Sequence, residues 1–224
     1  MYWIEMHIHT ECGSLDSTLN VKELMDEYKR LGIDGVCITE HVKWEKITEE
    51  EYKSLYGVFD EAQKMENCLD VFPGAEVKLP NNNEYLVLGI KIPYEWFELD
   101  WIEAIEKIHE CGEIIIKSHP YRDEGYVEPI DGIEKYNFCS SYSMNKMACE
   151  FVRKNSYLIW TIGCDAHSSD VVGMAITILE ERPKNGRDLV KMLKENRIKG
   201  YILAGNECRK EDIDETIFNC TYDS

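Results

Sequence analysis

Short apolar runs alternate with amphipathic segments along the chain, and this alternation predicts an α/β fold. A helix is expected over residues 21–31, where apolar side chains recur at i, i+3, i+4, i+7 and i+10, and Gly32 is placed to end it. A fully buried strand is expected over residues 113–117, whose centre is Ile-Ile-Ile. The same reasoning predicts strands at about 2–9, 35–39, 71–77, 85–92, 132–136, 157–163, 175–179 and 198–203, and helices at 47–67, 99–111, 143–155 and 187–196.

Side chains that bind metals stand at or near the ends of the predicted strands. His7 and His9 are two residues apart, so in a strand both imidazoles point to the same side. The full set is His7, His9, His41, Glu76, His119, Asp165 and His167. In a β/α barrel the carboxyl ends of the strands meet on one face, where active sites form, and imidazole together with carboxylate suits Zn, Mn or Fe. The remaining histidine, His109, falls inside a predicted helix and is expected to be structural or at the surface.

Composition limits the class of function. The chain has 224 residues, 44% of them hydrophobic, which is enough for one domain with a sizeable core. Its formal net charge of −18 argues against stable nucleic-acid binding, which needs clustered Lys and Arg. The nine cysteines show no Cys-x-x-Cys spacing, so we expect reduced thiols. No apolar run is long enough to span a membrane and the N-terminus does not read as a signal peptide, so we expect no membrane partner and a cytoplasmic location.

The strand-end residues belong to five motifs that follow one another in order. They read His7-Ile-His9-Thr10-Glu11 with Ser14-Leu15-Asp16, then Ile38-Thr39-Glu40-His41, Pro73-Gly74-Ala75-Glu76, Ser118-His119-Pro120 and Gly163-Cys164-Asp165-Ala166-His167. This series resembles the PHP family, the polymerase-and-histidinol-phosphatase metallo-phosphoesterases. The resemblance spans about residues 3–205, so it implies a single PHP-type barrel domain over residues 1–205, followed by a polar C-terminal tail over residues 206–224.

The resemblance implies a distorted (β/α)7 TIM-like barrel with two to three divalent metal ions, Zn, Mn or Fe, at the C-terminal ends of the strands. Carried over by position, the ligands of the first ion would be His7, His9, Glu76 and Asp165. Glu76 would also bridge to a second ion, which His119 binds. The ligands of the third ion would be Asp16, His41 and His167.

Two positions depart from the family pattern. The second motif usually reads Asp-His, whereas this chain has Glu40-His41, and we expect Glu40 to support the ligands rather than bind an ion. Many members carry a further histidine on the strand that follows the Glu76 counterpart, but residues 85–89 contain none. The second ion is therefore expected to be weaker, absent, or completed by Glu84 or water.

The activity implied is hydrolysis of a small phosphomonoester or phosphodiester, such as a nucleotide or sugar phosphate, by metal-bound hydroxide. Metal ions lower the pKa of bound water and neutralise phosphoryl oxygens, and the chain has neither a Gly-x-Ser-x-Gly elbow nor a P-loop. Glu76 and Asp165 would be catalytic through the ions. Arg122, on the loop after the fourth motif, has the shape for bidentate phosphate contact. Glu134 and Asn137 resemble a family pattern of residues that orient the ligands.

Three alternatives stay open at the level of the sequence. Histidinol phosphate is a candidate substrate by family association, although the chain has no obvious insertion to recognise an imidazole amine. An amidohydrolase-type metal hydrolase also begins with His-x-His, but it usually needs a bridging lysine. A metal-binding regulatory domain would keep the ligands without turnover. The oligomeric state is left open.

Overall fold

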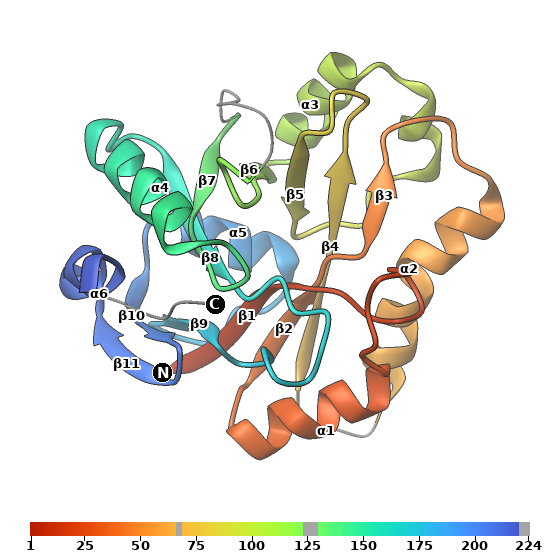
Figure 1. Cartoon of the computed structure of the whole chain (residues 1–224). Helices are drawn as coiled ribbons and strands as arrows, with labels where there is room; N and C mark the ends of the chain where they lie inside the picture. The colour runs from red at the N-terminus through yellow and green to blue at the C-terminus, as the bar shows by residue number, and fades with distance from the viewer. Residues whose placement is uncertain (66–68, 123–129, 220–224) are drawn as a thin grey trace.

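The computed structural model describes residues 1–65, 69–122 and 130–219, and there eleven strands form one mixed sheet with helices packed around it (Figure 1). The strands are β1 (Tyr2–Ile8), β2 (Gly35–Ile38), β3 (His41–Lys43), β4 (Asp70–Lys78), β5 (Glu84–Leu88), β6 (Ile114–Lys117), β7 (Gly132–Asn137), β8 (Ile159–Gly163), β9 (Ala175–Leu179), β10 (Ile198–Leu203) and β11 (Asn206–Arg209). The helices are α1 (Val21–Leu31), α2 (Glu49–Lys64), α3 (Trp101–Glu110), α4 (Tyr142–Lys154), α5 (Gly186–Lys194) and α6 (Ile213–Asn219), with 3-10 helices at Tyr94–Glu98 and Lys210–Asp212. The expected α/β class is confirmed.

Strand β4 is the longest strand and organises the sheet. Its first half pairs in parallel with β2 and its second half pairs in parallel with β3. Strand β5 runs antiparallel along its other edge, so the two strands form a hairpin. From this centre the order continues through β6, β7 and β8 on one side and through β2, β1, β9, β10 and β11 on the other.

Strand β1 and the segment after β8 meet where the first and last motifs lie. Ala166 forms a parallel bridge with Ile8, and the amides of His9 and Asp165 donate to the carbonyls of Ala166 and His7 at 3.1 and 2.9 Å. This contact is one bridge rather than a continuous ladder, and the β4–β5 and β5–β6 pairs are antiparallel. Strand pairing therefore does not close the sheet into the barrel that the sequence led us to expect, yet it sets the two motifs side by side.

Capping residues fix where the helices begin and end. The Thr48 hydroxyl accepts from the amide of Glu51 at 3.2 Å and the Glu51 carboxylate accepts from the amide of Thr48 at 2.6 Å, which is a capping box at the start of α2. Asn20 caps α1 in the same manner. Gly32 ends α1 with a φ of 75°, a left-handed conformation that glycine adopts at little cost. The chain then turns directly into β2.

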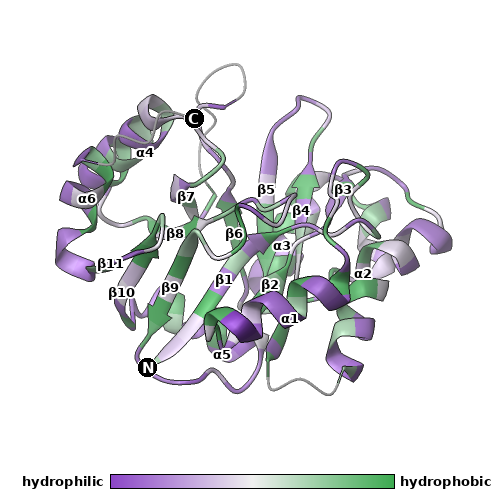
Figure 2. Cartoon of the chain, turned by 60° about the horizontal axis from the view of Figure 1, so that its bottom comes forward, coloured by the Kyte–Doolittle hydropathy of each residue, from purple (hydrophilic) through white to green (hydrophobic). Residues whose placement is uncertain are grey.

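The hydrophobic core lies between the strands and the inner faces of the helices. Figure 2 shows hydrophobic residues concentrated along the strands, while the helices carry hydrophilic outer faces. On α1 the inner face consists of Leu24, Met25 and Tyr28, all fully buried. Burying a large apolar side chain contributes about 1.5–3 kcal/mol, so these faces hold the helices against the sheet. In the described part of the chain, no helix has the length and apolar character needed to cross a membrane.

The C-terminal segment differs from the polar tail that was expected after residue 205. Residues 206–209 form β11, which pairs antiparallel with β10, and α6 follows. Ile213 and Ile217 of α6 are 2% and 1% exposed and belong to the main hydrophobic core. Two isoleucines four residues apart were too short a pattern to reveal a helix within a polar stretch. The segment is thus packed as part of the fold as far as residue 219.

Replacing Ile213 by alanine should lower the free energy of unfolding by about 2–5 kcal/mol, because it removes a buried side chain and leaves a cavity. Urea denaturation of the whole chain measures this change. Glu215→Ala, on the exposed face of the same helix, is the matched control and should change stability by less than about 0.5 kcal/mol. Equal effects of the two variants would show that α6 does not contribute to the core.

Candidate metal centre

The strand-end residues converge on one place at the carboxyl ends of β1, β4, β6 and β8. Five of them are at most 2% exposed, namely His7, His9, Glu76, His119 and Asp165. His41 and His167 are partly exposed and form the outer side of the cluster. Buried carboxylates and imidazoles are costly without compensating partners, so a concentration of this kind indicates a site rather than ordinary packing.

The side chains form three overlapping groups, in each of which the potential ligand atoms all lie within 4.8 Å of one another. The groups are His7, His9, Glu76 and Asp165; Glu76, Glu84 and His119; and His9, His41 and His167. The first holds the same residues that the resemblance implied for the first ion. The third contains His9 in addition to the implied histidines. Asp16, also implied there, has a side chain 68% exposed, with Oδ1 3.7 and 3.6 Å from Nε2 of His41 and His167.

The Nδ1 atoms of His7 and His9 contact neighbouring polar side chains, and their Nε2 atoms face each other. Nδ1 of His7 lies 2.9 Å from the Glu134 carboxylate, an acceptor, so Nδ1 carries the proton. Nδ1 of His9 lies 3.2 Å from the Ser14 hydroxyl, which donates its own proton to Glu40 at 2.7 Å. The two Nε2 atoms are 3.0 Å apart. Two lone pairs at this distance would repel, so a proton or a metal cation must lie between the two nitrogens, and the geometry suits either.

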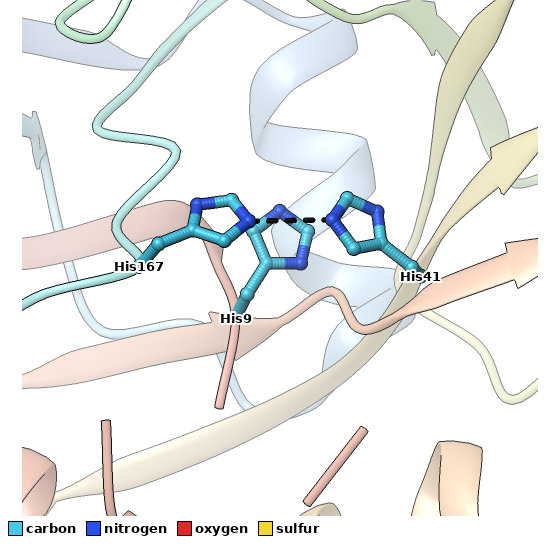
Figure 3. A group of neighbouring side chains, drawn as sticks. All are labelled: His9, His41 and His167. Carbon is cyan, nitrogen blue, oxygen red and sulfur yellow. Dashed lines mark hydrogen bonds between the residues drawn. The ribbon is translucent and has the colours of Figure 1, made fainter. Parts of the chain in front are cut away.

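The outer group repeats this pattern. Nδ1 of His167 donates to the carbonyl of Asp165 at 2.8 Å, and Nδ1 of His41 lies 2.9 Å from Oε2 of Glu76. The Nε2 atoms of His41 and His167 point toward each other at 3.3 Å, and the ring of His9 lies beside this contact (Figure 3). The His9 ring centroid is 4.0 Å from that of His41 and 4.4 Å from that of His167. His9 therefore contacts both the inner and the outer groups.

The group around His119 includes Glu84, the residue expected to replace the histidine that many family members carry. Nε2 of His119 lies 2.9 Å from Oε1 of Glu76 and 3.5 Å from Oε2 of Glu84. The amide of His119 donates to Glu134 at 2.8 Å, so one carboxylate positions both His7 and His119. His119 and Asp165 have φ values of 25° and 57°, which are uncommon outside glycine and typical of constrained sites. The mixed nitrogen and oxygen donors fit a divalent transition metal.

Burial and charge act against each other on the pKa values of the cluster. Burial alone would lower the pKa of His7, but the carboxylates of Glu134, Glu76 and Asp165 hold it well above its usual value. Burial alone would raise the pKa of Glu76, yet the charge of His7 and the hydrogen bond from His119 keep it well below its usual range. Burial lowers the pKa of His9 to about 4. The metal-free cluster therefore holds ionised carboxylates and a protonated His7 at neutral pH.

Metal binding should release protons, because a metal ligand must be a neutral imidazole and His7 is protonated at pH 7. The affinity should rise about tenfold per pH unit for each proton displaced, until the pH exceeds the raised pKa of His7. Titration calorimetry of metal-stripped protein with Zn²⁺ or Mn²⁺, in two buffers with different ionisation enthalpies, measures the protons released. An affinity that is unchanged between pH 6 and pH 8 would contradict this account of the cluster.

Arg122 lies at the side of the cluster that opens to solvent. Nη1 is 2.6 Å from Oδ2 of Asp165, and Nη2 donates to Oδ1 of Asn137 at 3.3 Å. Asn137 in turn donates to Glu134 at 3.0 Å, so Asp165, Arg122, Asn137 and Glu134 form one hydrogen-bonded chain. Arg122, Asp165 and the outer histidines line a cavity of about 730 Å³. A larger cavity of about 980 Å³, near the start of α5, is lined by none of the predicted ligands.

Other side chains have roles that the motifs did not specify. The Glu40 carboxylate accepts from the Thr10 hydroxyl at 2.6 Å and from Ser14, so it holds the loop between β1 and α1 in place. Ser14 in turn orients His9. His109 lies on α3, 2.9 Å from Asp131 and partly exposed, away from the cluster as expected. The position of Glu40 one residue before His41 was the only sequence signal for this support.

The comparisons with known proteins agree with this geometry. A family model described as PHP domain matches residues 5–218. A crystal structure from Bacteroides vulgatus, a two-domain protein containing a predicted PHP-like metal-dependent phosphoesterase, superposes with a TM-score of 0.68 at 16% identity and covers 97% of this chain and 69% of its own. PsfC from Pseudomonas syringae superposes with a TM-score of 0.58 at 17% identity and covers 84% of this chain and 87% of its own. No curated protein matches the chain.

The two structural similarities, at such low identity, establish the fold alone. The family model covers almost the whole described sequence, and it includes the C-terminal helix as well as all five motifs. On these grounds the chain belongs to the PHP domain family.

Proposed function

We propose that this protein is a metal-dependent phosphoesterase that hydrolyses a small phosphomonoester or phosphodiester, such as a nucleotide or sugar phosphate. The observation that carries the proposal is the set of three overlapping ligand groups, which share Glu76 and His9 and adjoin a cavity that also contains Arg122. Membership of the PHP family supports a metal-dependent hydrolase. The Bacteroides protein is itself described as a predicted phosphoesterase, which supports the same reaction class.

The residues proposed to hold the ions follow the three groups. His7, His9, Glu76 and Asp165 would hold the first ion, Glu76, Glu84 and His119 the second, and His9, His41 and His167, with Asp16 at the solvent side, the third. Ions of Zn, Mn or Fe at these places would acidify a water molecule and neutralise the charge of phosphoryl oxygens.

The protein's own residues would then orient and bind. Glu134 fixes the ring of His7 and the backbone of His119, so the ligands need not reorganise during the reaction. Arg122 is held by Asp165 and Asn137 with its guanidinium at the cavity, where it would bind two oxygens of a phosphate. Glu76 and Asp165 therefore contribute through the ions, and Arg122 contributes by contact with the substrate.

We also propose that β1, β2, β4, β5, β6, β7 and β8 correspond to the distorted seven-stranded barrel implied by the family, with a single bridge in place of a continuous ladder where β1 meets the end of β8. The bridge between Ile8 and Ala166, with its two flanking hydrogen bonds, supports closure at the metal end. This would place all the ligands on the face where β/α barrels carry their active sites.

Elemental analysis coupled to phosphate release tests the proposed function. Purified protein should contain transition metal, and it should release phosphate from members of a panel of phosphomonoesters and phosphodiesters, with chelation by EDTA abolishing release and Zn²⁺ or Mn²⁺ restoring it. Including histidinol phosphate, amide and lactone substrates separates the proposal from a histidinol phosphatase and from an amidohydrolase. Bound metal without turnover of any phosphoester would favour a regulatory domain.

A further inference from the structure

Strands β3 and β4 carry a pair of lysines next to the pair of residues that belongs to the candidate metal centre. Their parallel register sets His41 opposite Glu76 and Lys43 opposite Lys78. Side chains two apart in a strand share a face, so each lysine lies on the same face as the metal-binding residue of its own strand. The valines between them point the other way and are buried in the core with α2 and α3.

The paired lysines are an unfavourable arrangement unless an anion lies near them. Like charges directly opposite each other on neighbouring strands destabilise the sheet. Lys78 forms an ion pair with Glu84 at 2.8 Å, which compensates part of the charge. Lys43 is exposed, and none of the residues in the ranges 1–65, 69–122 and 130–219 forms an ion pair with it.

Both lysines line the cavity of the metal centre. They share its wall with Glu84, His119 and Arg122, and they also line an adjoining cavity of about 260 Å³. Glu45 lines both spaces as well, while Glu51 is engaged in the capping box of α2. The lysines thus stand between the metal centre and additional space that a substrate can occupy.

We propose that Lys43 and Lys78 bind a second anionic group of the substrate, a phosphate or a carboxylate. This inference rests on the proposed function and narrows the substrate to a phosphoester that carries another anion. Two residues of strand separate the lysines from His41 and Glu76, so the second anion lies about 7 Å from the phosphate at the ions. Arg122 approaches from the loop after β6 and binds the reacting phosphate, which leaves the lysines to select the substrate.

A matched set of substrates tests the inference on the metal-loaded, full-length protein. The set consists of propyl phosphate, 3-phosphonooxypropanoate and propane-1,3-diol bisphosphate, which differ only in the group at the far end. The two substrates that carry an anion at the far end should have kcat/KM values at least about 10-fold above that of propyl phosphate, the gain expected of one charge-assisted hydrogen bond. Whether the carboxylate or the phosphate gains more identifies the anion preferred.

The selectivity is the kcat/KM for the bisphosphate divided by the kcat/KM for propyl phosphate. Lys43→Gln should lower this ratio about 10-fold, mainly by raising KM for the bisphosphate, and Lys43→Glu should lower it further. Lys46→Gln is the matched control, because Lys46 is exposed, pairs with Glu98 and lines neither cavity, so the ratio should not change. Equal kcat/KM for the three substrates in the wild type, or a Lys43→Gln ratio equal to that of wild type, would overturn the inference and leave the phosphoesterase intact. No hydrolysis of any substrate would instead overturn the proposed function.

Discussion

Glu76→Gln should reduce phosphoester hydrolysis by more than about 100-fold and lower the affinity for two metal ions at once. Changes to residues that merely support a metal site cost about 10–100-fold, and Glu76 is proposed to contact the ions directly. It belongs to two ligand groups, and its carboxylate lies 2.9 Å from His119 and from His41. Glutamine keeps the size of the side chain but cannot supply a charged oxygen to both groups. Metal content by elemental analysis and phosphate release measure the two effects together.

Glu84→Gln provides the matched control for this prediction. Glu84 lies in one ligand group and is partly exposed, so its amide variant should weaken only the ion near His119 and leave the first ion in place. A metal content that falls equally in both variants would show that Glu76 does not join the groups. If Glu76→Gln hydrolyses phosphoesters at the wild-type rate, Glu76 has no role in catalysis.

The longer helices and the buried strands could be predicted, because each is encoded by an apolar pattern within its own segment of the sequence. Helix α1 has a regular apolar face and ends at Gly32, and β6 contains three consecutive isoleucines, which favour a fully buried strand. Strand β3 is three residues long, which is too short to show any period. Its existence depends on pairing with β4, a contact between distant segments that no local pattern encodes.

The same limit applies to the site. Residues such as His7, Glu76 and Asp165 could be located because each occurs at a strand end within a recognisable motif. Lys43 was not among the candidates, because its significance comes only from the register that puts it opposite Lys78. Ser14 stands in the first motif, but its bond to His9 depends on how the loop folds back over the strand end. The spacing of residues in the sequence shows which side chains each strand can place at the site. The pairing of strands decides which of these side chains lie next to one another.

His9→Ala should weaken both the first and the third metal ions by about 10–100-fold or more, whereas Asp16→Ala should weaken only the third. The motif alone assigns His9 to the first ion. In the structure its Nε2 lies 3.0 Å from that of His7, and its ring stacks against His41 and His167, so it belongs to both groups. Asp16 is exposed and approaches the outer histidines alone.

Titration of each metal-stripped variant with Zn²⁺, followed by calorimetry, resolves these losses as separate binding steps. Ser14→Ala is an informative companion, because it removes the hydrogen bond to Nδ1 of His9 without removing a ligand. It should reproduce the His9→Ala effect in weaker form, by about 10-fold, since partners of this kind tune rather than supply the ligand. If His9→Ala loses one binding step and still binds the third ion as the wild type does, His9 is a ligand of the first ion alone. The third group would then be a site separate from the two groups that share Glu76.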